Sequence, residues 1–260
     1  MRSLRSRITA FAIAVVLICL ASLGGIIVLY GHTVAERSAA DQLKLLCDQC
    51  RASIDDRLDS IEQSVETVSR YAAEDLGARG LEDLDEHLLR IDGLFHSVAH
   101  NTNGVLTYYY RLAPEIAGGN KGYWYQYSIT DGDFVSAPVT DLEAFDPDDV
   151  SRVGWYYIPK LRGEPTWLDP YFNKNLGVSM VSYVVPIYHA GTFIGVIGMD
   201  LGQNVLTDEI RAISLYRSGY AFLTTADGAV LWHPTIQKGT VIDSLAEGLG
   251  SWDEDGILTY

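Results

Sequence analysis

The sequence predicts an α+β protein that starts with an N-terminal transmembrane helix, continues as a long stalk helix and then forms an antiparallel sheet. Three observations carry this prediction: an uncharged apolar segment at 8–30, a helical apolar stripe within 31–78, and aromatic-rich strand segments after residue 104. The chain has 260 residues, enough for one large domain or two small ones.

Residues 8–30 (ITAFAIAVVLICLASLGGIIVLY) contain no charged side chain and are long enough to cross a bilayer. Arg2, Arg5 and Arg7 precede them, so we predict that residues 1–7 stay in the cytoplasm. A signal peptide would start with the same charges. The apolar run is longer than a typical signal-peptide core and no clear A-x-A site follows it, which favours an uncleaved anchor. We therefore predict a single-pass protein of the inner or plasma membrane, with 31–260 extracytoplasmic.

The formal net charge of −15 argues against nucleic-acid binding, because such a chain cannot neutralise phosphates. The sequence also contains no G-x-S-x-G, no H-E-x-x-H and no glycine-rich phosphate loop followed by Lys. Asp146, Asp148 and Asp149 could act as paired acids, but solvated loop carboxylates are the commoner case. We predict no enzymatic activity and no cofactor.

The stalk helix carries apolar residues at steps of three and four, which mark one helical face. This stripe consists of Leu43, Cys47, Cys50, Ile54, Leu58, Ile61, Val65, Val68 and Ala72. The pattern does not separate packing on the protein's own sheet from packing on a partner's helix. Cys47 and Cys50 lie on the stripe, so we predict small buried apolar roles rather than a redox motif, with a disulfide, within or between chains, as the less common alternative. Gly77 and Gly80 should end the helix.

A second helix is predicted over 81–100, with leucines spaced for burial. His96 and His100 lie one helical turn apart, a spacing that permits metal ligation. No third ligand such as the Glu of H-E-x-x-H accompanies them, so we predict no metal site.

Strands are predicted next, because aromatic and β-branched residues alternate with turn signals. The predicted strands are 105–113, 122–129, 134–138, 178–188 and 192–201, the last two forming a hairpin around His189-Ala190-Gly191. A short helix is predicted within 146–161, with Asp146 as its N-cap. Another helix is predicted at 204–214, followed by a strand-turn-strand unit up to Pro234.

Aromatic residues crowd the segment before the hairpin, where they either fill a core or line a pocket. They are Trp155, Tyr156, Tyr157, Trp167 and Tyr171. Asp200 ends an apolar strand, where a charge is costly unless it is paired, and an aromatic cage with one carboxylate suits a cationic amine. Ordinary core aromatics beside a strand-end Asp are the alternative.

A regular strand would place Ile194, Val196, Gly198 and Asp200 on one face of the sheet. Since Gly198 has no side chain, we expect an open space in front of the Asp200 carboxylate.

Trp155-Tyr156, Tyr171 and Asp200 after G-V-I-G-M resemble the ligand motif of the double Cache (dCache) sensor domains. These are extracytoplasmic, PAS-like modules of bacterial chemoreceptors, histidine kinases and diguanylate cyclases. The resemblance implies a membrane-distal PAS-like ligand-binding module at 79–203. The pattern G-Y-A-F-L, D-G and H-P resembles the start of a membrane-proximal PAS-like module, so 204–260 is expected to be a linker helix and part of that module.

The resemblance also implies roles for the motif residues. Asp200 would hold an amine, Trp155 and Tyr156 would pack over the ligand, and Tyr171 would close its side. The amino-acid-binding branch has Arg-x-Trp-Tyr, whereas here Val153 holds the Arg position and Arg152 lies one residue upstream, from where it would reach a carboxylate. Further candidates on the pocket strands are Tyr108, Tyr110, Trp124 and Tyr127.

The resemblance implies a sensing input domain of a transmembrane receptor that binds a small amine or amino acid and forms a homodimer through the long helix. The alternative is a membrane-anchored structural or adhesive domain without a ligand, in which the aromatic residues form a sealed cluster and Asp200 is paired with an Arg or Lys. No second apolar span follows, so we expect a fragment of a longer receptor or a vestigial second module.

Overall fold

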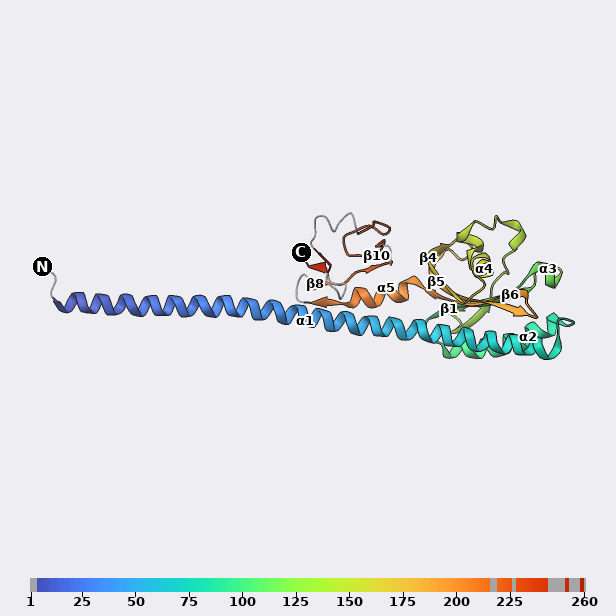
Figure 1. Ribbon diagram of the computed structural model, residues 1–260, viewed down its shortest axis with the longest axis horizontal. Helices are drawn as coiled ribbons and strands as arrows, with labels where there is room; N and C mark the ends of the chain where they lie inside the picture. Colours follow the sequence, from blue (N-terminus) through green and yellow to red (C-terminus); the bar gives the residue numbers. More distant parts are fainter. Residues whose placement is uncertain (1–3, 216–218, 226–227, 243–250, 253–257, 260) are drawn as a thin grey trace. The chain divides into compact units, whose positions relative to one another are not determined.

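The structure is a computed structural model that describes residues 4–215, 219–225, 228–242, 251–252 and 258–259 (Figure 1). The helices are α1 Leu4–Arg79, α2 Leu84–Asn101, α3 Pro114–Ala117, α4 Val150–Arg162 and α5 Gln203–Ala212, with the 3-10 turn η1 at Leu142–Ala144. The strands are β1 Val105–Leu112, β2 Gly122–Ser128, β3 Asp133–Ser136, β4 Thr166–Asn173, β5 Val178–His189, β6 Thr192–Gly202, β7 Ser214–Leu215, β8 Gly219–Tyr220, β9 Leu223–Thr224, β10 Val230–Trp232, β11 Ser251–Trp252 and β12 Leu258–Thr259. The predicted α+β class is confirmed.

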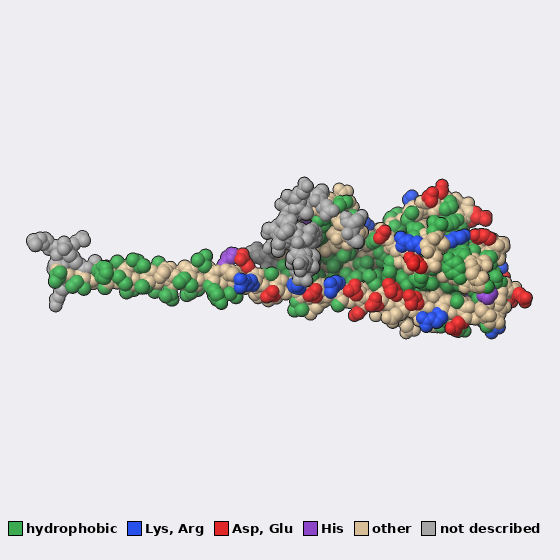
Figure 2. Space-filling model, viewed as in Figure 1, with side chains coloured by type: hydrophobic (Ala, Val, Ile, Leu, Met, Phe, Trp, Pro, Cys, Tyr) green, Lys and Arg blue, Asp and Glu red, His purple; other side chains and the backbone are tan. Residues whose placement is uncertain are grey.

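The chain divides into two compact units, of which the first contains residues 1–49 and 213–220. Its helix, the first part of α1, has an apolar segment with the length and composition to cross a membrane, a property that anchors share with signal sequences. Figure 2 shows hydrophobic side chains along this segment and charged ones after it. Cys47 is exposed, so its predicted burial is wrong. No disulfide joins the three cysteines, all of which the structure describes.

The second unit contains residues 50–212 and 221–260, and here α1 packs on the protein's own sheet. Ile61, Val65, Val68 and Ala72 are fully buried in a core shared with α2 and one face of the sheet. Over this stretch the apolar stripe of α1 therefore packs on the sheet of the same chain and not on a partner's helix. This packing removes apolar surface of both the helix and the sheet from water.

Of the two glycines predicted to end α1, Gly77 and Gly80, only the second does so. Gly77 remains helical, whereas Gly80 adopts φ +74° and donates its N–H to the Leu76 carbonyl at 2.8 Å. A left-handed residue after the last turn is a common helix stop and favours glycine. Asp83 then caps α2 by accepting from the Glu86 N–H at 3.1 Å, which explains why α2 starts at Leu84 and not at the predicted Leu81.

The sheet has six strands in the order β3-β2-β1-β6-β5-β4, all antiparallel. Residues 50–79 of α1 together with α2 cover one face, and α4 covers the other (Figure 1). Strand β4 was not predicted from the sequence, since Pro170 lies within it. Pro is tolerated there because β4 is an edge strand, and the pairing register shifts between Leu168 and Tyr171.

Three local predictions need correction. Helix α4 starts at Val150 after Asp149, while Asp146 accepts the Asp148 N–H at 3.0 Å in the preceding turn and is not the N-cap. The β5–β6 loop is only Ala190-Gly191, both at positive φ, as two-residue hairpin turns require. Ile194 is a bulged residue on β6, so it packs on the helix face, opposite to Val196.

Beyond α5 the described strands are short: β9 pairs with β10, and β11 with β12. The second strand of the predicted strand-turn-strand unit corresponds to β10, and Ala229 forms a bridge to Val241. The turn of that unit, Ala226-Asp227-Gly228, lies partly outside the described residues.

A buried ionic network joins α1, α2 and β1. The Asp75 carboxylate, 8% exposed, accepts from Arg90 Nε at 3.0 Å and Nη2 at 2.8 Å and contacts His87 Nδ1 at 2.7 Å. His87 Nε2 in turn contacts the Tyr110 hydroxyl at 3.0 Å. The hydrogen bond from Arg90 is the main reason that the pKa of Asp75 falls to about 2.

We expect Asp75→Asn to remove stability at neutral pH but not at about pH 2. Because the folded pKa lies below the unfolded value of about 3.9, the charge contributes above that value and is lost as the pH falls towards 2; the contribution is about 2 kcal/mol. Urea unfolding of parent and variant across this range measures it. Asp85→Asn is the control, since Asp85 pairs with Lys121 at the surface. Parallel pH profiles for parent and Asp75→Asn would contradict the assignment.

Candidate functional site

Strand β1 presents its side chains alternately to the two sheet faces, and this separates the candidate residues. Tyr109 lies on the α4 face with Trp124, Trp155 and Tyr156, in a group that we call the aromatic cluster. Tyr110 lies on the opposite, helix face of the sheet, where it contacts His87. The prediction that Tyr110 lines the same site as Trp155 and Asp200 is therefore wrong. Tyr108 also lies on the helix face, and Tyr127 is 39% exposed near the edge strand β3.

The aromatic cluster is built around Trp155 of α4. Its ring centroid lies 4.9 Å from that of Tyr109 and 5.1 Å from that of Trp124, and only 1% of the residue is exposed. Its Nε1 donates to the Arg152 carbonyl at 2.9 Å, so the indole is held by both edge-on ring contacts and a hydrogen bond. Tyr156 packs edge-on against Trp155 and is also 1% exposed. The rings pack between α4 and the centre of the sheet.

Several polar atoms in and beside the aromatic cluster are buried without a hydrogen-bond partner. They are Tyr109 Oη, Trp124 Nε1, Tyr156 Oη and Asp200 Oδ1. Leaving a buried polar group unsatisfied costs about 1–3 kcal/mol, and more for a charge. Four such atoms on one side of one sheet are unusual for a core whose only role is packing.

Asp200 lies in the central strand β6, paired with Thr107 of β1 on one side and Ser182 of β5 on the other. Only 1% of it is exposed. The Thr107 hydroxyl donates to Oδ2, while Oδ1 has no partner. Burial raises the pKa of Asp200 to about 6, against the opposing effect of the Ser182, Thr107 and Tyr109 hydroxyls. Asp200 forms no ion pair with any Lys or Arg of the described chain.

The space in front of Gly198 is occupied, contrary to the expectation from the sequence. A Cβ at Gly198 would lie 2.6 Å from both Cζ and Oη of Tyr109. Glycine is therefore required at this position because the Tyr109 ring lies across the strand next to Asp200. Tyr109 was missed from the sequence, since three consecutive tyrosines in β1 do not reveal which one faces α4.

Tyr171 comes to the same place from the edge strand β4. Its hydroxyl lies 3.2 Å from Ser182 Oγ, and Ser182 is the β5 neighbour of Asp200. Burial, followed by the nearby Asp200 carboxylate, raises the pKa of Tyr171, so the phenol stays protonated at neutral pH. The structure thus brings Tyr171, Ser182 and Asp200 together.

Arg152 is not part of this group. Its side chain extends from the first turn of α4 to the neighbouring loops, with Nη1 3.3 Å from Asn175 Oδ1 and Nε 3.8 Å from Asp149 Oδ2. The guanidinium also lies 4.9 Å from the Phe145 ring centroid. These contacts hold loops together, and the side chain does not point into the aromatic cluster.

A different arginine is buried on the same sheet face, and sequence reasoning missed it. Arg111 follows Tyr109 by two positions in β1 and is 2% exposed. Its Nη1 donates to the Lys121 carbonyl and its Nη2 to Asn120 Oδ1, while Nε has no partner. Burial lowers the pKa of Arg111. Because both terminal nitrogens are engaged by the α3–β2 loop, Arg111 holds that loop to the sheet.

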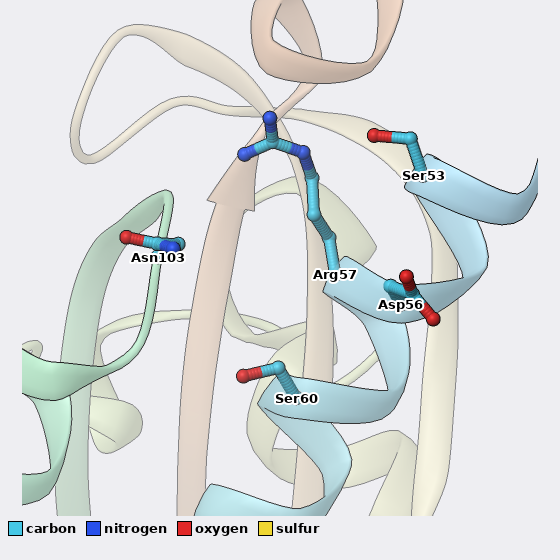
Figure 3. A pocket seen from close by; sticks show the side chains of 5 residues that line it. All are labelled: Ser53, Asp56, Arg57, Ser60 and Asn103. Carbon is cyan, nitrogen blue, oxygen red and sulfur yellow. The ribbon is translucent and has the colours of Figure 1, made fainter. Parts of the chain in front are cut away.

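A separate hollow of about 280 Å³ lies beside α1 (Figure 3). It is lined by Ser53, Asp56, Arg57, Ser60 and Asn103. Arg57 Nη2 pairs with Glu209 of α5 at 2.6 Å. This hollow contains none of the predicted site residues and has no aromatic wall, so the aromatic cluster with Asp200 is the better candidate for binding an organic ligand.

Residues 32–259 match the family model dCache_1, described as a Cache domain. Among curated proteins, the methyl-accepting chemotaxis proteins PctB and TlpQ of Pseudomonas aeruginosa are 32% and 34% identical over 45% and 36% of this chain. The matched segments cover only 18% and 14% of those receptors, so this chain corresponds to a small part of such proteins.

Solved structures show the same fold. The sensory domain of the Campylobacter jejuni chemoreceptor Tlp3 (CcmL) aligns with a TM-score of 0.58 and 18% identity, covering 84% of this chain and 83% of that one. The extracellular domain of the histidine kinase mmHK1S-Z3 aligns with a TM-score of 0.52 and 22% identity, covering 76% and 71%. The ligand-binding domain of P. aeruginosa PctC in complex with GABA aligns with a TM-score of 0.53 and 20% identity, covering 79% and 82%.

Proposed function

We propose, from the premise that this chain belongs to the dCache_1 family of Cache sensor domains, that it is the extracytoplasmic sensing domain of a transmembrane receptor and binds a small amine or amino acid. Cache sensor domains are non-catalytic ligand-binding modules related to the sensory domains of chemoreceptors and histidine kinases. The family supports the role as a sensing domain, whereas the ligand class has to be argued from the residues of this chain.

The observation that carries the ligand class is the buried Asp200 carboxylate, whose Oδ1 has no partner. A ligand ammonium at Oδ1 would form a charge-assisted hydrogen bond and offset the desolvation of the carboxylate. The neighbouring rings of Tyr109 and Tyr171 favour a cation, because aromatic faces attract positive charge. Similar folds with isoleucine or GABA bound support the same chemistry.

Ligand binding would act by population shift. A ligand held between α4 and the sheet favours whichever arrangement of α4 it contacts best, and it shifts the equilibrium only by that difference in affinity. The sheet face opposite the site packs on α1, the helix that leads towards the membrane segment. We therefore propose that α1 transmits the conformational change from the sheet towards the membrane.

The wider organisation belongs to the same proposal. It comprises a cytoplasmic N-terminus (1–7), a membrane helix (8–30), a stalk (31–78), a membrane-distal module (79–203) and a partial proximal module (204–260). A homodimer would form through α1, where Val34 and Leu45 are exposed apolar residues. Oxidative cross-linking at the exposed Cys47 tests the dimer, and a failure to cross-link in membranes would count against it.

Calorimetry on the full chain in detergent tests the ligand class with three compounds that share one carbon skeleton: GABA, n-butylamine and butyrate. We expect the two amines to bind and butyrate not to, because Asp200 repels a carboxylate. Arg152→Ala should leave the butylamine affinity unchanged, since the Arg152 side chain contacts Asn175 and Phe145 and not the aromatic cluster. Binding of butyrate alone would show that the proposed amine chemistry is wrong.

A further inference from the structure

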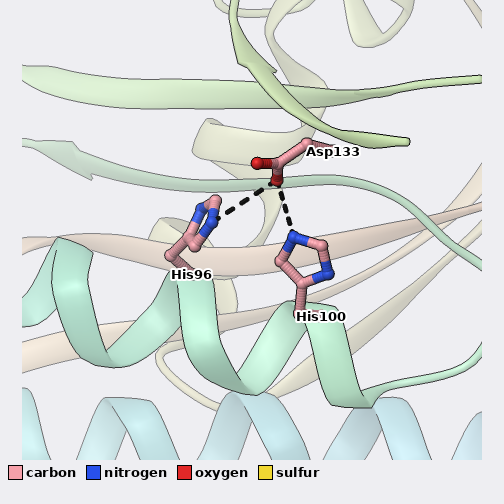
Figure 4. A group of neighbouring side chains, drawn as sticks. All are labelled: His96, His100 and Asp133. Carbon is pink, nitrogen blue, oxygen red and sulfur yellow. Dashed lines mark hydrogen bonds and ion pairs between the residues drawn. The ribbon is translucent and has the colours of Figure 1, made fainter. Parts of the chain in front are cut away.

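A second group of titratable side chains lies on the opposite face of the sheet from Asp200. His96 and His100 project from one side of α2 towards Asp133, the first residue of β3 (Figure 4). One ligand atom from each residue lies within 4.8 Å of the other two. The sequence pattern identified only the two histidines as neighbours, and the fold brings Asp133 next to them.

The three side chains converge on a carboxylate oxygen. His100 Nε2 lies 2.6 Å and His96 Nε2 3.5 Å from Asp133 Oδ1. The Phe134 N–H donates to the same oxygen at 2.6 Å and so fixes the carboxylate. The histidine side chains are 38% exposed and the Asp133 side chain 52%, so the group is open to solvent on one side.

We propose that His96, His100 and Asp133 form a binding site for a divalent transition-metal ion, with Zn²⁺ as the best match. Two imidazole nitrogens and one carboxylate oxygen are the donor set that leaves a fourth position of a tetrahedral ion open to water. Bonds of about 2.0–2.2 Å place tetrahedral ligand atoms roughly 3.3 Å apart. The His96–Asp133 separation of 3.5 Å is close to this spacing, and the His100–Asp133 separation is about 0.7 Å shorter than it. Since all three ligand atoms lie within 4.8 Å of one another, side-chain rotations can bring them to the tetrahedral spacing.

The surroundings orient the ligands. His96 Nδ1 lies 2.9 Å from the Tyr108 hydroxyl, a contact that holds the ring with Nε2 towards Asp133. Histidines that bind metals usually use their second nitrogen in this way. The Phe134 ring packs edge-on against His96 and His100 and restricts both rings.

A metal here would add coordinate bonds to the existing contacts between α2 and β3, which are the His100–Asp133 pair and the packing of Phe134 on both histidines. Binding requires the folded arrangement, so the metal would stabilise the native state in proportion to its concentration. Protons compete for the imidazoles, so affinity should be lower at about pH 5.5 than at about pH 7.5.

The test uses the full chain in detergent, purified without a polyhistidine tag, stripped with a chelator and titrated with ZnCl₂ by calorimetry. We expect one Zn²⁺ per chain and a zinc-dependent rise in the thermal midpoint. His100→Gln and Asp133→Asn should each weaken Zn²⁺ binding at least about tenfold, because each removes a ligand. His189→Gln is the matched control: it lies half-exposed in the β5–β6 hairpin and should bind like the parent. Co²⁺ provides an independent readout through its visible absorption.

Other results would overturn the proposal. One is a parent chain that binds no Zn²⁺, and another is Zn²⁺ binding that survives both His100→Gln and Asp133→Asn. If the group serves only as a structural hydrogen bond, the variants should lose stability in chelator and the parent should show no zinc-dependent stabilisation. Asp133→Asn keeps a hydrogen-bond acceptor for His100, so it remains informative if His100→Gln folds poorly.

Discussion

Asp200→Asn is expected to abolish amine binding and, at about pH 7.5, to make the ligand-free protein more stable than the parent by about 3 kcal/mol. A neutral amide loses the charge-assisted hydrogen bond to an ammonium. The same substitution removes a buried charge that lacks a cationic partner among the described residues. Function and stability should therefore change in opposite directions.

The pH dependence gives the sign of the stability effect. Because the pKa of Asp200 is raised to about 6 in the folded state, folding favours its protonated form. This contribution is complete below the unfolded value of about 3.9 and is lost as the pH rises through 6. The parent should lose stability relative to Asp200→Asn between about pH 4 and pH 7.5, and amine affinity should fall as the pH drops below 6.

Urea unfolding at the two pH values and calorimetry with butylamine measure both effects. Asp169→Asn is the control, because Asp169 is an exposed carboxylate on β4 of the same sheet. If Asp200→Asn binds the amine as tightly as the parent does, the carboxylate is a structural residue.

Trp155→Ala is expected to cost about 3–5 kcal/mol of unfolding free energy, because it removes a fully buried indole from between Tyr109 and Trp124. Trp155→Phe should cost less, since it keeps a ring and loses mainly the Nε1 hydrogen bond to Arg152, worth about 1 kcal/mol. Denaturant unfolding of the ligand-free chain measures both losses.

Ligand affinity decides what the Trp155 result means. If the ring forms a wall of the ligand site, Trp155→Phe should weaken amine binding by more than its small stability loss accounts for. A large stability loss in Trp155→Ala, with amine affinity unchanged in Trp155→Phe, would favour a sealed aromatic core.

The sequence predicted much of the fold because its local signals were strong. Strands β1, β5 and β6 were predicted from runs of β-branched and aromatic residues, and the C-terminal end of α1 was predicted from glycine. The edge strand β4 was missed because Pro170 argues against a strand unless its edge position is known. Whether a strand lies at the edge or in the centre of a sheet depends on the whole sheet and cannot be predicted from the residues of that strand alone.

The candidate site was predicted only in part, for a similar reason. Trp124, Trp155, Tyr156, Tyr171 and Asp200 do lie on the α4 side of the sheet. Strands buried on both faces show no polar alternation, so the sequence could not assign Tyr109 and Tyr110 to different faces. Asp133 was missed as a partner of His100 because the two residues are 33 positions apart.

The alternation of Tyr108 and Tyr109 constrains how β1 can move. A slide by one residue would turn Tyr108 from His96 on the helix face to the α4 face beside Gly198, and would turn Tyr109 from Gly198 to the helix face. Such a slide would break the contacts of β1 on both faces of the sheet at once and is therefore disfavoured. Any motion of β1 that follows ligand binding is expected to be a tilt or rotation of the whole strand, which moves the chemistry on both faces at the same time.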